Sequence, residues 1–232
     1  MKKLIVSNHN SDLEWLKMTH DYGFSMENIV IYDRSDIEKD WSHLGLNIRS
    51  PNVGENIYDI MRFIVENYSC LPDISIFIKG NLFSRFEDRG GINYYTTKEK
   101  FIRALNANYF LPIERYHPST TIFVNCGNFI EPTWHPNDNI PRKYFSTFAE
   151  LLNLIFIDPP NPPFIRFAPG GNYVVPKGNI LKYSIKFYKK LQMYCSHIEH
   201  HTCAEAFLIE RLLYIMWTED LTEKLINSYE NI

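Results

Sequence analysis

The chain has 232 residues, of which 45% are hydrophobic and 15% aromatic. A chain of this size and composition can bury a substantial core, which excludes an intrinsically disordered protein and favours one large domain. The formal net charge of −3 excludes a general basic field that would attract nucleic acid, so we predict no nucleic-acid partner.

The sequence also bears on the compartment. No uninterrupted apolar run is long enough to cross a bilayer, and the stretch MKKLIVSNHN contains too short an apolar segment for a signal peptide. The four cysteines form no C-x-x-C pair, so reduced thiols are expected. We therefore expect a cytoplasmic protein, either free or at the periphery of a membrane. The sequence gives no prediction of its oligomeric state.

Three apolar stretches in the first half of the chain have the pattern of buried strands. They are KLIVSN (3–8), NIVIYDRSD (28–36) and DISIFIKGN (73–81). Helical patterns lie between them, so the order begins β-α-β and continues with a loop, a helix and a strand. This order predicts an α/β fold with a mostly parallel central sheet and helices on both faces.

The two helices in this half have recognisable starts. Ser11 and the glutamate three residues later, Glu14, have the spacing of a capping box at the start of the helix at 11–23. The second helix covers residues 52–68, and Asn52 can cap it.

The second half is less regular. Short capped helices are expected at 96–107 and 146–156, separated by a long segment at 111–143 that we interpret as a functional loop region. A short strand is expected at 173–175. Two helices, at 179–195 and 202–217, close the chain.

Polar residues follow the expected strands, where open α/β sheets bind ligands. The loop Ser7–Asn10 precedes a helix whose free N–H groups can bind an anion, although a polar turn with a helix cap explains it as well. Asp33 can accept from ribose hydroxyls or a base N–H, or be a simple turn residue. Gly54 would allow a phosphate to approach the backbone, or serve turn geometry alone. Dinucleotide and P-loop motifs are absent.

The carboxyl-terminal third offers further candidates. HIEHH places His197 and His201 four residues apart, a spacing that can bind zinc on a helix, but a solvated helix junction explains it better. In the apolar helix at 202–217, Glu205 fits a capping box with Thr202. Glu210 has no such explanation, so we interpret it as functional or as one half of a buried ion pair.

These segments together resemble a known family. SNHNSDLEWL, NVGENIYDIMRFIVENYSCLPDISIFIKGN, FAPGGNYVVPKGNI and EAFLIERLLYIMW follow, in order, the pattern of a poorly characterised family of bacteria, fungi and giant viruses. That family is grouped with glycosyltransferases of the GT-A fold. The resemblance covers nearly the whole chain and thins at about 90–160. It implies one GT-A-like, Rossmann-like domain over 1–232, with a nucleotide-sugar half at 1–90 and an acceptor half at 91–232.

The resemblance also implies site residues. The nucleotide sugar would contact or lie close to residues Ser7, Asn8, Asn10, Asp33, Asn52, Gly54, Glu55, Lys79, Gly80 and Asn81. The acceptor would bind near Pro169, Gly170, Gly171 and Asn172. Lys79, Gly80 and Asn81 occupy the position at which related enzymes carry a D-x-D metal clamp, a motif that this chain lacks.

Because the D-x-D motif is missing, the sequence leaves two alternatives for metal dependence. A lysine at this position can stabilise a leaving diphosphate as a point charge, which makes a metal-independent enzyme one alternative. Mn²⁺ or Mg²⁺ held by Asn81 and a distant acid or histidine is the other.

We therefore predict a glycosyltransferase of polysaccharide biosynthesis. It would transfer a sugar from a UDP- or GDP-linked donor to a glycan or lipid-linked acceptor. Glu210 is the expected acid or base, and Asp138 is the reserve. The alternatives are a non-catalytic carbohydrate- or nucleotide-binding module and a zinc hydrolase built on HIEHH.

Overall fold

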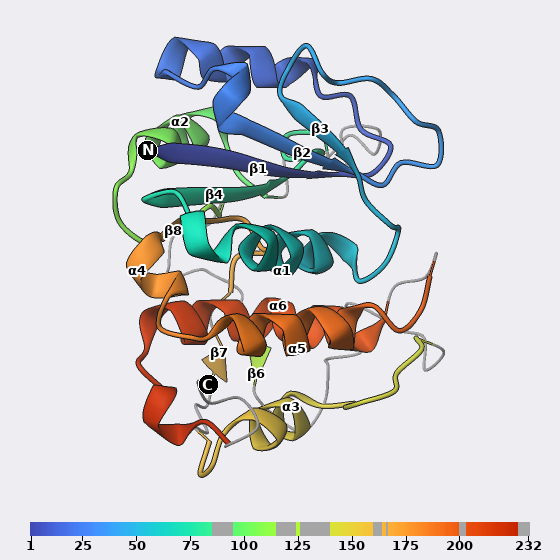
Figure 1. Cartoon of the computed structure of the whole chain (residues 1–232), viewed down its shortest axis with the longest axis vertical. Coiled ribbons are helices and arrows are strands. Elements are labelled where there is room, and N and C mark those ends of the chain that lie inside the picture. Colours follow the sequence, from blue (N-terminus) through green and yellow to red (C-terminus); the bar gives the residue numbers. More distant parts are fainter. Residues whose placement is uncertain are drawn as a thin grey trace. The chain divides into compact units, whose positions relative to one another are not determined.

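The structure is a computed structural model of the whole chain (Figure 1). It describes residues 1–84, 95–114, 140–159, 167–199 and 203–226, together with the backbone of 124–125 and 164–165. Its contacts form two compact units, and both units draw on both halves of the sequence. The first comprises Met1–Pro51, Ser69–Thr120 and Ala168–Asn179, and the second comprises Asn52–Tyr68, Thr121–Phe167 and Ile180–Ile232.

A six-stranded mixed sheet organises the first unit (Figure 1). Its strands, in spatial order, are β3 (Leu46–Arg49), β2 (Ile29–Asp33), β1 (Lys2–Asn8), β4 (Ile74–Lys79), β8 (Tyr173–Pro176) and β5 (Leu111–Pro112). The first four strands are parallel, whereas β8 runs antiparallel to both β4 and β5. The prediction of an α/β fold with a mostly parallel sheet is therefore confirmed.

Short helices pack against this sheet through one apolar core. The helices of the first unit are η1 (Glu14–Tyr22), η2 (Met26–Asn28) and α2 (Lys98–Asn106). Alternate strand residues and the apolar sides of η1 and α2 form the core, which includes Leu4, Val6, Leu16, Ile29, Ile31, Ile76, Ile78, Phe101 and Leu105. Each side chain of this size contributes about 1.5–3 kcal/mol when it is fully buried.

The start of η1 differs from the prediction. The segment is a 3₁₀ helix that begins at Glu14, and its N-cap, Leu13, makes no side-chain bond, so the predicted capping box is wrong. The two residues of the expected box have other partners. The N–H of Ser11 donates to Asn8 Oδ1 at 3.3 Å, and the Glu14 carboxylate pairs with Lys17 and His43.

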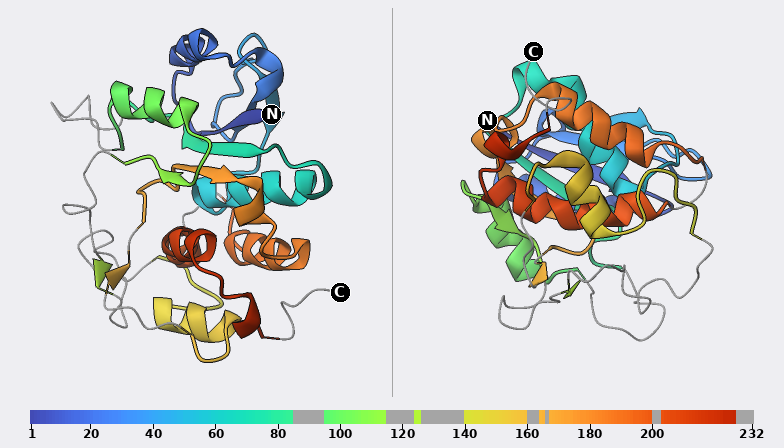
Figure 2. Two further views of the ribbon diagram at one scale, coloured as in Figure 1. Left: turned by 90° about the vertical axis from the view of Figure 1, so that its left-hand side faces the viewer. Right: turned by 90° about the horizontal axis from the view of Figure 1, so that it is seen from below.

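Helices dominate the second unit. They are α1 (Glu55–Asn67), α3 (Phe148–Ile155), α5 (Ile185–Cys195) and α6 (Ala204–Thr218). The α6 helix packs against the other three, and Figure 2 shows α5 and α6 side by side. Shorter elements complete the chain: η3 (Tyr68–Cys70), α4 (Lys177–Ile180), η5 (Thr222–Lys224), and the antiparallel pair β6 (Val124–Asn125) and β7 (Phe164–Ile165).

The N-cap of α1 lies two residues after the expected one. Its N-cap is Gly54, in a left-handed conformation with φ 55°, so the prediction that Asn52 caps it is wrong. A Cβ on Gly54 would lie 2.5 Å from Cys195 Cβ and 2.6 Å from the carbonyl oxygen of Cys195. Glycine is therefore required here both by the backbone conformation and by the close approach of α1 to α5.

Candidate functional site

The strand order creates a topological switch point in the first unit. The chain builds outward from β1 through β2 to β3, and then returns to place β4 on the other side of β1. Ligands of open α/β sheets bind outside the carboxyl ends of the strands at such a point. Asn8, Asp33 and Lys79 are the last residues of β1, β2 and β4. Three predicted site residues therefore lie at the same edge of the sheet.

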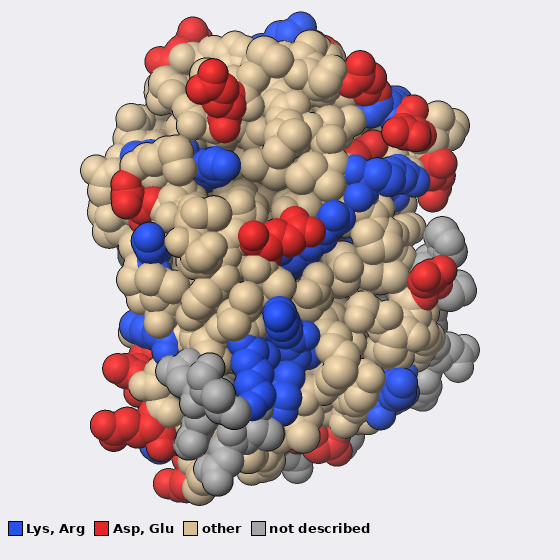
Figure 3. All heavy atoms as spheres, in the orientation of Figure 1, with Lys and Arg blue, Asp and Glu red and all other residues tan. Residues whose placement is uncertain are grey.

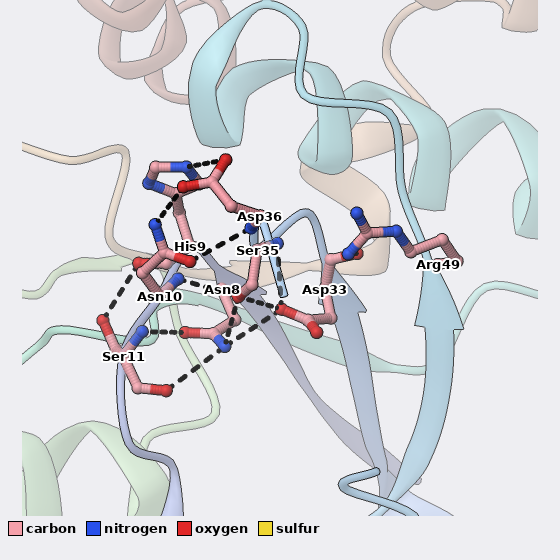
Figure 4. Close-up of polar contacts among 8 residues, drawn as sticks. All are labelled: Asn8, His9, Asn10, Ser11, Asp33, Ser35, Asp36 and Arg49. Carbon is pink, nitrogen blue, oxygen red and sulfur yellow. Dashed lines mark hydrogen bonds and ion pairs between the residues drawn. The ribbon is translucent and has the colours of Figure 1, made fainter. Parts of the chain in front are cut away.

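Asn8 ends the strand that lies between β2 and β4, and Figure 4 shows its contacts on the β2 side. Its side chain is fully buried, and its Nδ2 donates to Asp33 Oδ1 at 3.1 Å. On the other side, Gly80 donates its N–H to the carbonyl oxygen of Ser7 at 2.8 Å. A Cβ on Gly80 would lie only 2.4 Å from Asn8 Oδ1. Gly80 is thus required by space for the Asn8 side chain, and not by an unusual backbone conformation.

The Asp33 carboxylate is buried, and among the described residues only one of its two oxygens has hydrogen-bond partners. Its Oδ1 accepts from Asn8 and also from the hydroxyl and the N–H of Ser35, at 2.6 and 3.3 Å. Its Oδ2 is buried without a hydrogen-bond partner among the described residues. Arg49 Nη1 lies nearby and donates to the carbonyl oxygen of Asp33 at 3.4 Å. Sequence reasoning missed Ser35, although an Asp-x-Ser spacing is typical of a side-chain turn.

Exposed polar contacts join the loops after β1 and β2 (Figure 4). Asn10 and Asp36 exchange two hydrogen bonds, of 2.7 and 3.1 Å. His9 Nε2 lies 3.8 Å from Asp36 Oδ1, and the N–H of Asn10 donates to Ser35 Oγ at 2.7 Å. The loop at 7–10 therefore lies against Asp36 and Ser35, and both residues were absent from the sequence-based site.

The end of β4 is bonded to the turn that was predicted to bind the acceptor. The N–H of Lys79 donates to Asn172 Oδ1 at 2.9 Å, and Asn172 Nδ2 donates to the carbonyl oxygen of Pro169 at 2.7 Å. The Lys79 ammonium lies 5.8 Å from the centre of the Tyr95 ring. The structure thus brings Lys79 and residues 169–172 together. Asn172 is fully buried and holds this turn in place.

The remaining predicted residues have different outcomes. Asn81 is half-buried in the turn that follows Lys79. Asn52, Gly54 and Glu55 belong to the second unit. Asp138 lies outside the described residues. The roles predicted for these residues stay predictions.

The burial of the two glutamates of α6 differs from what the sequence predicts. Glu210 is half-buried, whereas Glu205 is fully buried. The N-cap of α6 is Cys203 and makes no side-chain cap bond. Glu205 Oε1 instead accepts the N–H groups of Lys143 and Tyr144, at 2.6 and 2.8 Å. The prediction of a capping role for Glu205 is therefore wrong, because donors from another segment bind its carboxylate.

His197 also differs from its prediction. The α5 helix ends at Cys195, so His197 lies in a bend beyond the helix and not on it. Its side chain is only 5% exposed, which makes the solvated-junction interpretation wrong for this residue. His201 lies outside the described residues.

The residues at the sheet edge offer few ligands for a divalent cation. Among the described residues, no three His, Cys, Asp or Glu ligand atoms gather there. Mg²⁺ at phosphate sites is commonly held by one or two carboxylates and the substrate phosphates. Asp33 and Asp36 could supply these carboxylates, but the other ligands would have to come from the substrate.

Surface charge shows no strong bias on the face seen in Figure 3. Most of this face is neither acidic nor basic. Acidic side chains are scattered over it, and Lys and Arg gather in more than one place, including over α5, which contains three lysines. In the part of the chain that the structure describes, no helix has the length and apolar character needed to cross a membrane.

Comparison with known proteins identifies the family but not the activity. Neither the curated proteins nor the solved structures contain a match. One family model matches residues 4–227, which is nearly the whole chain, and it is described as "Protein of unknown function (DUF3431)". This description names no activity, so the glycosyltransferase resemblance stays a prediction. The chain belongs to the DUF3431 family of proteins of unknown function.

Proposed function

We propose that the protein is a glycosyltransferase that binds a UDP- or GDP-linked sugar at the carboxyl edge of β1, β2 and β4. The sugar would pass to a glycan or lipid-linked acceptor near the turn at 169–172. Glu210 is the proposed acid or base, with Asp138 as the reserve. The sequence resemblance suggests this reaction, and the geometry of the sheet edge supports a donor site there.

The observation that carries the proposal is the unpartnered Oδ2 of Asp33. A buried polar atom without a hydrogen bond costs about 1–3 kcal/mol, and more when it belongs to a charged group. Buried groups of this kind in native proteins call for an explanation, and a ligand donor is one. Ribose hydroxyls and base N–H groups are such donors, and Asp33 ends a strand beside the switch point.

Access to Asp33 requires the loops above it to separate. Asp33 is 1% exposed, so a ligand reaches Oδ2 only after a local opening. The contacts of Asp36 with Asn10 and His9 are exposed, and exposed polar and ionic contacts contribute little stability. We therefore assign the opening to the loop at 7–10 and Asp36, with Asn8 and Ser35 holding Oδ1 in place.

Lys79 supplies the positive charge that the proposal needs near a diphosphate. Its ammonium lies beside Tyr95 at the end of β4. A lysine acts on phosphate as a point charge. If it replaces the metal, Lys79→Ala lowers transfer more than EDTA does. Loss of transfer in EDTA with a nearly silent Lys79→Ala variant contradicts this part of the proposal.

The test is a thermal-shift panel of nucleotides and nucleotide sugars, with and without Mn²⁺. A ligand at 100 times its Kd stabilises the native state by about 2.7 kcal/mol, which corresponds to a Tm increase of about 5–10 °C for a chain of this size. Stabilisation by no nucleotide refutes the proposal. Binding of a nucleotide sugar with no transfer to any acceptor favours the non-catalytic binding module.

Two matched variants locate the site. Asp33→Asn keeps an oxygen for the Oδ1 bonds and replaces Oδ2 by a donor, so nucleotide affinity falls by about 10–150-fold, the equivalent of one charged hydrogen bond. Asp21→Asn removes an exposed carboxylate of η1, outside the proposed site, and serves as the control. Equal affinity in both variants contradicts the role of Asp33.

A further inference from the structure

A second group of unexplained polar atoms lies in the helical unit. His197 follows the end of α5, Cys203 is the N-cap of α6, and Glu205 lies in the first turn of α6. One ligand atom from each lies within 4.8 Å of the others. The side chains of His197 and Glu205 are 5% and 0% exposed, and Cys203 is fully buried. The proposed glycosyltransferase site uses none of these three residues.

The hydrogen bond on the far side of the imidazole fixes its tautomer. His197 Nδ1 lies 3.0 Å from the carbonyl oxygen of Tyr194. A carbonyl can only accept, so Nδ1 carries the proton, and the lone pair of the neutral ring is on Nε2. Metal-binding histidines commonly donate their other ring N–H to a backbone carbonyl in this way.

Glu205, like His197, has one polar atom held by the backbone and one atom free to face a ligand. Its Oε1 is held by the N–H groups of Lys143 and Tyr144, which leaves Oε2 to face His197. His197 Nε2 and Glu205 Oε2 are 3.7 Å apart, and neither has a hydrogen-bond partner among the described residues. This separation is too long for a direct hydrogen bond. It is close to the distance of about 3.4 Å between nitrogen and oxygen ligands of one tetrahedral zinc ion.

We propose that His197 Nε2, Cys203 Sγ and Glu205 Oε2 bind a Zn²⁺ ion. A nitrogen, a sulfur and an oxygen donor suit zinc, whereas Mg²⁺ and Ca²⁺ prefer oxygen ligands alone. Three protein ligands leave the fourth position of a tetrahedral ion to water. The ion would tie the end of α5 to the start of α6 and to the segment at 143–144.

The electrostatics of Cys203 favour the neutral thiol when no cation is bound beside it. Burial, with a further contribution from the charge of Glu205, raises the pKa of the Cys203 thiol to about 11. Cys203 Sγ lies 3.6 Å from the carbonyl oxygen of Cys195 and donates to it. A bound zinc ion deprotonates a coordinating thiol, and its positive charge offsets the repulsion between thiolate and carboxylate.

The rival explanation is a buried ion pair between protonated His197 and Glu205. Metal content separates the two explanations directly. The tag-free full-length chain, purified under reducing conditions and reconstituted with Zn²⁺, is expected to retain one zinc per chain after gel filtration. With Co²⁺ in place of zinc, a thiolate-to-cobalt charge-transfer band is expected, which reports on Cys203 without any mutation.

Two conservative variants test the ligands while preserving the fold. Cys203→Ser places a preferred residue at the N-cap of α6, so loss of metal cannot be attributed to loss of the helix. Glu205→Gln keeps an oxygen for the two backbone donors and removes the charge. In both variants zinc affinity falls by more than the 10–100-fold typical of losing an outer-shell partner. Cys70→Ser, which changes an exposed cysteine, is the control and retains zinc.

Two results would overturn the proposal. One is a reconstituted chain with no bound zinc and no cobalt–thiolate band, in which case the group is an ion pair. The other is an unchanged zinc content in both Cys203→Ser and Glu205→Gln, which would place the ion elsewhere.

Discussion

The substitution Gly80→Ala tests the geometry of the sheet edge most directly. Gly80 has an ordinary backbone conformation, so the alanine side chain is excluded only by its neighbours. The new Cβ would lie 2.4 Å from Asn8 Oδ1 and 3.0 Å from Leu13 Cδ2. Asn8 must then move, and its hydrogen bond to Asp33 breaks or lengthens. We expect a loss of about 1–3 kcal/mol in unfolding free energy, the usual cost of overpacking.

A double-mutant cycle with Asn8→Ala isolates the clash. Asn8→Ala alone removes the bond to Asp33 and is expected to cost about 1–3 kcal/mol, because a buried partner is left without its donor. In the Asn8→Ala background, the oxygen that meets the new Cβ is absent. Gly80→Ala should then cost at least about 1 kcal/mol less than it does in the wild type.

Urea unfolding of the four proteins measures these differences, and unchanged m-values show that the same surface is exposed in each. Gly178→Ala is the control, because a Cβ there meets no atom within 4 Å. Additivity of the two substitutions within about 0.5 kcal/mol would refute the packing of Gly80 against Asn8. Donor binding provides a second measurement, because displacement of Asn8 disturbs the carboxylate of Asp33.

Three further predictions concern the second unit and the thiols. Gly54→Ala should lower the unfolding free energy by more than about 2 kcal/mol, because the new Cβ lies 2.5 Å from another atom and the backbone there is left-handed. Gly178→Ala in α4 should be neutral or slightly stabilising. Equal urea midpoints for the two variants would contradict this prediction. In metal-free protein at pH 8, the Cys203 thiol, with a pKa of about 11, is only about 0.1% thiolate. Mass spectrometry after limited alkylation should therefore find the exposed Cys70 modified before Cys203. The reverse order would contradict the burial of Cys203. If Glu210 is the acid or base, Glu210→Gln should keep a near-normal Tm and lose at least about 100-fold in kcat; full activity in a fully stable variant would exclude the role.

The sequence predicts the inner strands well because their physical signal is local. β1, β2 and β4 are short apolar runs with buried side chains on both faces of the sheet, and such runs are detectable without tertiary information. β3 was not predicted. Its residues are exposed or half-buried, with Leu46 59% exposed, because it is an edge strand. An edge strand with one neighbour leaves little hydrophobic pattern in the sequence.

The candidate site could be predicted only in part for the same reason. Asn8 and Asp33 were identified because each ends a recognisable strand. The role of Asn172 was not, because its amide bonds to Lys79, which is 93 residues away in the chain. Ser35 and Asp36 bond to Asn8 and Asn10 across 25 to 27 residues. Contacts of this kind depend on strand pairing, and no local sequence pattern contains it.

The two glutamates of α6 show how far helical periodicity can support a functional assignment. Periodicity gives the face of the helix on which a residue lies, but it does not reveal which donors approach that face from other segments. Glu210 was singled out because an idle carboxylate in an apolar helix would carry a desolvation cost. In the structure this argument applies more strongly to Glu205, which is fully buried and has one oxygen without a partner among the described residues.

The same substitution at the two positions therefore separates two kinds of function. Glu205→Gln preserves an acceptor for Lys143 and Tyr144, and should abolish the stabilisation of the protein by Zn²⁺ without a direct effect on the chemical step. Glu210→Gln should leave zinc content unchanged and act on kcat alone. If Glu205→Gln instead lowered kcat while zinc content stayed constant, the acid or base of the reaction would be Glu205. Its buried, unpartnered oxygen would then be a catalytic group and not a metal ligand.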